Sequence, residues 1–151
     1  MELSLIKDTE NLSKKICKII KAGDVIFLYG KIGVGKTTFV RFLINNLEIK
    51  NGIKKSDVLS PTFNIVYYYT INKITIQHYD LYRLKNNNDI LELGMFEDFA
   101  NHIKLVEWPE LIKTKPKDRI DILFQYSQSM KSRKANIIGF GKWKNYKFNE
   151  F

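Results

Sequence analysis

The sequence is poor in cysteine and proline, and it contains no long hydrophobic run. Its one cysteine, Cys17, excludes an internal disulfide and agrees with a reducing compartment. No early apolar stretch has the form of a signal peptide, and none approaches the ~20 residues that a membrane-spanning helix needs. We therefore expect a cytoplasmic protein that does not contact membranes.

Arginine is also scarce, although the chain carries a net charge of +9. Only four of the 25 basic residues are arginine: Arg41, Arg83, Arg119 and Arg133. Lysines can bind a phosphate backbone by displacing counterions, but here they are spread along the chain instead of forming one stripe. This pattern leaves direct binding of nucleic acid open without favouring it.

The length of 151 residues suits one domain, which we assign to residues 1–151, because no repeat or flexible linker divides the chain. Residues 2–7 (ELSLIK) alternate like a short strand. Asp8 or Thr9 can then cap a helix that ends at Gly23. Residues 25–29 (VIFLY) are continuously apolar, as in a strand buried on both faces.

Further along the chain, residues 37–47 suit a helix and the polar, basic residues 48–58 a surface loop. The remaining segments are a hairpin at 65–71 and 74–79, short helices at 89–93 and 96–101, and strands at 103–106, 119–126 and 134–140. Together they predict an α/β fold: a single P-loop NTPase-like domain whose mixed, mostly parallel central sheet carries an antiparallel hairpin and helices on both faces.

A glycine-rich loop follows the apolar strand and matches the pattern G-x-x-x-x-G-K-[ST] in full. Its glycines allow backbone N–H groups to converge on phosphate oxygens, and the following helix directs its positive end at the same anion. Lys36 should reach the β- and γ-phosphates, and the Thr37 hydroxyl should hold Mg²⁺. The predicted nucleotide-binding residues of the loop are Gly30, Lys31, Ile32, Gly33, Val34, Gly35, Lys36, Thr37 and Thr38.

A carboxylate at the end of another core strand should complete the Mg²⁺ site, and two residues qualify. Asp80 ends ITIQHYD and Glu107 ends IKLVE, each where an apolar strand meets a loop. Either one can be the main metal ligand. The segment SPTF places the Thr62 hydroxyl where nucleotide switches carry a sensing loop. We therefore predict a catalytic role for Thr62 in addition to the two acids, Glu107 and Asp80. His78 and His102 form no zinc-type cluster, and we interpret both as structural.

The segments GKIGVGKTTFVRFL, SPTFNIVYYY, HYDLYRL, LELGMFEDF and VEWPE occur together and in this order, and the chain thereby resembles the TsaE (YjeE-type) ATPases. The resemblance runs from about residue 9 to residue 109. It implies an ATPase that uses ATP and Mg²⁺, acts with the TsaD and TsaB proteins in forming threonylcarbamoyladenosine in tRNA, and contacts the tRNA only indirectly.

Carried over by position, the resemblance makes Lys36 and Thr37 the phosphate and Mg²⁺ contacts. It makes Glu107 the metal-side acidic residue and Asp80 a second acidic residue of the metal site. It also places Thr9 near the nucleotide, and Trp108 matches the tryptophan beside the family's acidic residue. Leu59 departs from the pattern, because relatives carry Lys or Arg before SPT.

Three other functions remain as alternatives. A small-molecule or nucleotide kinase would need several cations around the moving phosphoryl group, and the four arginines are scattered. A GTPase usually has an N-K-x-D loop, whereas Asn72-Lys73-Ile74-Thr75 lacks the aspartate. A non-hydrolysing, nucleotide-dependent binding module also fits the loop. No arginine finger is evident in the chain, so we expect hydrolysis to be slow without partners.

Overall fold

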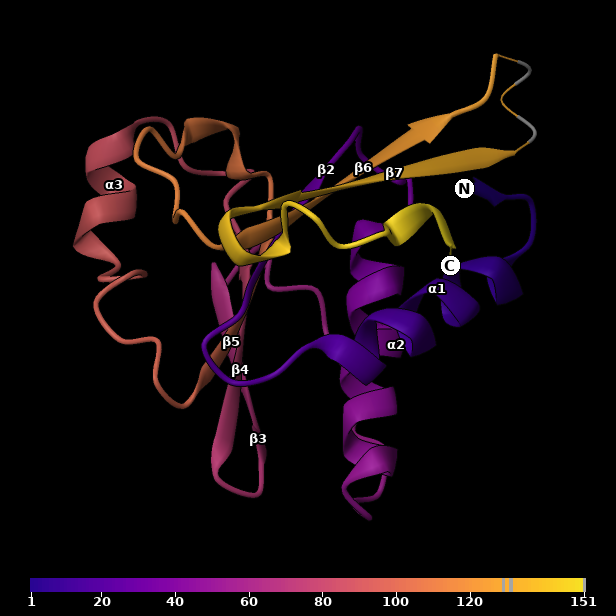
Figure 1. Ribbon diagram of the computed structural model, residues 1–151. Helices are drawn as coiled ribbons and strands as arrows, with labels where there is room; N and C mark the ends of the chain where they lie inside the picture. Colours follow the sequence, from indigo (N-terminus) through magenta and orange to yellow (C-terminus); the bar gives the residue numbers. More distant parts are fainter. Residues whose placement is uncertain (129, 131, 151) are drawn as a thin grey trace.

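A computed structural model describes residues 1–128, 130 and 132–150. A seven-stranded sheet runs through the molecule, with helices on either side (Figure 1). In spatial order its strands are β1 (Glu2–Leu3), β7 (Arg133–Phe140), β6 (Arg119–Tyr126), β2 (Val25–Tyr29), β5 (His102–Glu107), β4 (Ile74–Asp80) and β3 (Val66–Ile71).

The four central strands β6, β2, β5 and β4 are parallel, and the pairings at both edges are antiparallel. The sheet is therefore mixed, as predicted, with three parallel pairings and three antiparallel ones. The expected hairpin is β3–β4. Its second strand also pairs with β5, so it belongs to the parallel centre of the sheet.

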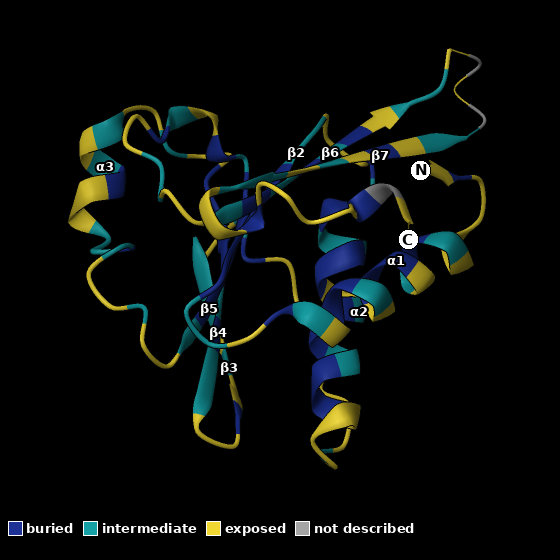
Figure 2. Cartoon of the chain, viewed as in Figure 1, coloured by how far each residue is buried: buried dark blue, intermediate teal, exposed yellow. Residues whose placement is uncertain are grey.

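Helices α1 (Ile6–Ile19) and α2 (Lys36–Lys50) cover one face of the sheet, and α3 (Asn87–Glu92) lies on the other (Figure 1). Strand β2 carries apolar side chains on both faces of the sheet, so both faces must be packed against other elements. Ile26 and Leu28 belong to the hydrophobic cluster under α1 and α2, whereas Val25 and Phe27 belong to the cluster on the α3 side. All four side chains are fully buried, and buried residues gather in the central strands and α2 (Figure 2).

The predicted start of the first helix is wrong. Helix α1 begins at Ile6, because Leu5 takes an extended conformation at the N-cap and its N–H donates to Asp8 Oδ2 at 2.7 Å. Asp8 therefore lies within the first turn and Thr9 is buried inside the helix. The early strand is correspondingly short, since only two residues of ELSLIK pair with β7.

Two further boundaries differ from the prediction. The segment 48–58 is only partly a loop, because α2 continues to Lys50. Its buried Glu48 accepts hydrogen bonds from Ser56 N–H (2.9 Å) and from the Asn45 amide (3.0 Å), which ties the following loop to the helix. The segment 96–101 forms turns instead of a helix, with Phe96 and Phe99 stacked side by side.

Short 3₁₀ helices lie at Pro109–Leu111, Gly141–Trp143 and Phe148–Glu150. Across the described residues, no helix combines the length and the apolar character needed to cross a bilayer.

Candidate functional site

The glycine-rich loop connects the end of β2 to the start of α2. Gly30, Gly33 and Gly35 have φ values of +132°, +75° and +111°, in the region that favours glycine. Gly35 is the N-cap of α2 and has no side chain to cap the helix, so the first N–H groups of α2 are available to an anion. The local sequence therefore builds an anion cradle at this point.

A cavity of about 290 Å³ opens beside this loop. It is lined by Ile32, Gly33, Gly35, Lys36, Thr37, Thr38, Ser60, Thr62, Asp80, Tyr82, Glu107 and Trp108. The loop, the end of β4 and the end of β5 therefore meet at one edge of the sheet, as expected for a ligand site in a parallel sheet.

Lys36 lines this cavity and is buried. Its ammonium group donates to the carbonyl oxygens of Gly30 (2.6 Å) and Lys31 (3.1 Å) and lies 3.8 Å from the centre of the Trp108 ring. Burial lowers the pKa of Lys36 below its usual value, while the Glu107 and Asp80 carboxylates act in the opposite direction. The Lys36 ammonium group is thus held by the loop itself and must leave these carbonyls to reach a phosphate.

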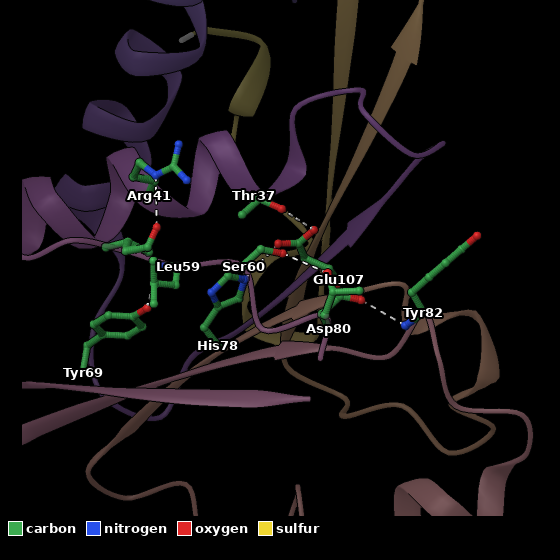
Figure 3. Close-up of polar contacts among 11 residues, drawn as sticks. Thr37, Arg41, Leu59, Ser60, Tyr69, His78, Asp80, Tyr82 and Glu107 are labelled. Atoms are coloured by element: carbon green, nitrogen blue, oxygen red, sulfur yellow. Dashed lines mark hydrogen bonds and ion pairs between the residues drawn. The ribbon is translucent and has the colours of Figure 1, made fainter. Parts of the chain in front are cut away.

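The two predicted carboxylates lie next to each other, because Asp80 and Glu107 pair in register at the ends of β4 and β5. Both are buried. The Thr37 hydroxyl donates to Glu107 Oε2 at 3.0 Å, so the second residue of α2 and the last residue of β5 are in direct contact (Figure 3). Of the two acids, Glu107 is the one bonded to Thr37.

Asp80 is bonded to different groups. Its Oδ2 accepts from the Thr62 hydroxyl at 2.7 Å, and its Oδ1 accepts from Tyr82 N–H at 3.0 Å. The Ser60 and Thr62 hydroxyls are 2.9 Å apart. The SPTF segment is thus bonded to the end of β4 through a side chain that also faces the cavity.

The backbone just before SPTF is fixed from two sides (Figure 3). Arg41 of α2 donates to the carbonyl oxygen of Val58 at 3.1 Å, and the Tyr69 hydroxyl of β3 accepts from Leu59 N–H at 3.2 Å. After SPTF, Ile65 has a φ of +68°, a strained conformation for a β-branched residue. These contacts bring Thr62 to the cavity across a long stretch of loop.

Two aromatic side chains complete the wall of the cavity. The rings of Tyr82 and Trp108 are 4.9 Å apart, and Trp108 adopts a left-handed backbone conformation with a φ of +59°. Since Trp108 follows Glu107 and precedes Pro109, this turn directs the chain away from the sheet immediately after the acid.

Sequence reasoning interprets His78 as structural and does not connect it with Glu107. His78 is fully buried in β4, and its Nε2 lies 2.8 Å from Glu107 Oε1. Figure 3 shows its ring beside Glu107. The alternation of His78 with Asp80 along one strand was the available signal, because it places both side chains on one face of the sheet.

Most of the predicted nucleotide-site residues line the cavity, and four do not. Gly30 and Lys31 contribute the carbonyls that hold Lys36, and Val34 is buried against the α1–α2 cluster. Thr9 is buried in α1, and its hydroxyl has no hydrogen-bond partner within the described part of the chain. Its contact with a nucleotide stays a prediction.

No arginine is found among the described residues that line the cavity. Arg133, at the start of β7, lies close to the glycine loop. A Cβ atom placed on Gly35 would lie 2.8 Å from Arg133 Nη1. The four scattered arginines of the sequence therefore do not gather around the two acids.

The glycine loop lies between a buried parallel strand and a helix, and two acids lie at the ends of neighbouring strands. This arrangement defines an α/β domain of the P-loop NTPase type. A family model described as "Threonylcarbamoyl adenosine biosynthesis protein TsaE" matches residues 3–135. The chain belongs to the TsaE family.

Curated relatives support this assignment. The tRNA threonylcarbamoyladenosine biosynthesis protein TsaE of Rickettsia prowazekii is 39% identical over 107 residues, which cover 71% of this chain and 72% of the relative. The protein of the same name from Nostoc sp. is 35% identical over 140 residues, covering 89% and 82% of the two chains. The crystal structure of Bacillus subtilis YdiB aligns with a TM-score of 0.71 at 24% identity, covering 99% of this chain and 90% of that one, and it supports the fold alone.

Proposed function

We propose that the protein is a Mg²⁺-dependent ATPase that supports the formation of threonylcarbamoyladenosine in tRNA together with TsaD and TsaB. The observation that carries this proposal is the 3.0 Å hydrogen bond between the Thr37 hydroxyl and Glu107. It joins the hydroxyl that holds Mg²⁺ in P-loop proteins to a strand-end carboxylate, the usual second acidic contact. Membership of the TsaE family supports the pathway, and the partners are those that the family resemblance implies.

The donor set fits a magnesium–nucleotide complex. Within the described residues, no group of three or more His, Cys, Asp and Glu side chains is placed to hold a metal ion by itself. Thr37 and Glu107 instead offer two neighbouring oxygens to a cation that takes its other ligands from phosphates and water, as Mg²⁺ prefers. When bound, Mg²⁺ would neutralise phosphate charge and polarise the γ-phosphoryl group.

The chain's own groups then have separate roles. The N–H groups of the loop and of the first turn of α2 bind the phosphates, and Lys36 moves from the loop carbonyls to the β- and γ-oxygens. Asp80 accepts a hydrogen bond from the attacking water and orients it, and Thr62, which is bonded to Asp80 without nucleotide, senses whether the γ-phosphate is present. Water attack yields ADP and phosphate.

The direct test is phosphate release from ATP by the protein alone, with TsaD and TsaB, and finally with tRNA. We expect slow turnover alone, because no arginine lines the described cavity, and faster turnover with the partners. Competition by GTP and a search for small acceptors in the same assay distinguish a GTPase or a kinase. Equal, negligible turnover in all mixtures would contradict an ATPase and leave a nucleotide-dependent binding module.

The variant Glu107→Gln tests the role of this carboxylate. It keeps the shape of the side chain but removes the charge, so nucleotide should stay bound while partner-stimulated turnover falls by about 100-fold or more. Glu110→Gln is the matched control, because Glu110 is exposed three residues further on and does not line the cavity. Unchanged turnover in Glu107→Gln would assign the metal contact to Asp80.

A further inference from the structure

The carboxylate of Glu107 is held at both of its oxygens by different elements. The Thr37 hydroxyl from α2 binds Oε2 at 3.0 Å, and His78 from β4 binds Oε1 at 2.8 Å. The His78 and Glu107 side chains are almost fully shielded from solvent, at 0% and 2% exposure. Water therefore does not replace the imidazole as the partner of Oε1.

The direction of this hydrogen bond follows from chemistry. An ionised carboxylate only accepts, so Nε2 of His78 must carry the hydrogen. The other ring nitrogen, Nδ1, is buried and has no hydrogen-bond partner among the described residues. The ring thus has a single polar contact, and the fold tolerates a buried, unsatisfied ring nitrogen that an apolar residue would avoid.

We propose that His78 is a positioning residue that fixes the rotation of the Glu107 carboxylate, so that Oε2 faces Thr37 and the divalent cation of the bound nucleotide. The inference rests on the proposed function, since it concerns how the same site holds its cation. His78 acts through Glu107 and lies behind it, outside the residues that line the cavity. Partners of this kind orient metal-ligating side chains, and their loss typically weakens metal binding by about 10- to 100-fold.

The test compares His78→Leu, which removes the donor, with His78→Gln, whose amide nitrogen can occupy the position of Nε2. The readout is the Mg²⁺ concentration that half-saturates the binding of a fluorescent ATP analogue, together with binding in EDTA and the melting temperature. His102→Gln is the control, because His102 is partly exposed and lies 3.4 Å from an exposed aspartate far from the cavity.

We expect His78→Leu to need at least tenfold more Mg²⁺ while its binding in EDTA is unchanged, and His78→Gln to recover most of the loss. A wild-type Mg²⁺ requirement in His78→Leu would overturn the proposal. If the leucine variant does not fold, His78→Asn replaces it. Its shorter amide cannot reach Glu107, so equal Mg²⁺ requirements in the Asn and Gln variants would also overturn the proposal. Absence of Mg²⁺-dependent binding in the unmodified protein would instead refute the proposed function.

Discussion

Replacement of Lys36 by methionine separates the charge of this side chain from its packing. Methionine retains most of the buried stem and removes the ammonium group, which in the nucleotide-free protein is bonded to the carbonyls of Gly30 and Lys31. Because the ammonium must leave these partners to bind ATP, its net contribution is smaller than the sum of its phosphate contacts.

The size of the effect follows from these contacts. Two charge-assisted hydrogen bonds to phosphate oxygens are worth about 3–6 kcal/mol together. Breaking the two bonds to neutral carbonyls costs about 1–3 kcal/mol. The midpoints of the two ranges differ by about 2.5 kcal/mol, which corresponds to roughly 70-fold weaker binding of ATP.

Calorimetric titration of Lys36→Met with ATP and Mg²⁺ measures this loss directly. Lys73→Met is the matched control, because it removes the same charge from the exposed β3–β4 turn. The melting temperature of each variant, taken without nucleotide, shows whether the fold is intact. Binding of ATP by a folded Lys36→Met protein as tightly as by the control would refute the assignment of the phosphate site.

Two further variants test the fold around the site. Gly35→Ala should lower the free energy of unfolding by about 1–3 kcal/mol in denaturant titration, because φ is +111° and the new methyl group would meet Arg133. Unchanged stability would show instead that the loop relaxes freely. Lys104 is buried beside Gln77, and burial lowers its pKa in the folded protein. As the pH falls from about 10, Lys104 is therefore protonated in the unfolded chain before it is protonated in the folded protein. The folded state loses stability over this range, down to the pKa of Lys104 in the folded protein. Lys104→Met should therefore stabilise the protein more at neutral pH than near pH 10, and an equal effect at both would contradict the cause given for the pKa shift.

The parts of the site that are local in sequence were predictable. The loop from Gly30 to Thr37 carries its own geometry in its glycines, and the apolar run before it has to be a buried strand. Asp80 and Glu107 were both predicted at the site because each ends a core strand, and the parallel register places them side by side. The family follows from motifs that the sequence already contains.

The parts that depend on distant partners were not predictable. His78 shares a strand face with Asp80, but its partner Glu107 lies 29 residues away on another strand. Glu48 was assigned to a polar loop, although its carboxylate is the buried anchor of that loop. The start of α1 was misplaced because Leu5, not a polar residue, occupies its N-cap. In each case a tertiary contact decides, and the local sequence does not identify the partner.

A crystal structure of the protein with Mg²⁺ and a non-hydrolysable ATP analogue examines the proposed site most directly. It should show the Lys36 ammonium moved from the Gly30 and Lys31 carbonyls onto the phosphates, with the cation between Thr37, Glu107 and the phosphate oxygens. An analogue bound elsewhere, or Lys36 still bonded to the loop carbonyls beside a bound analogue, would contradict the assignment.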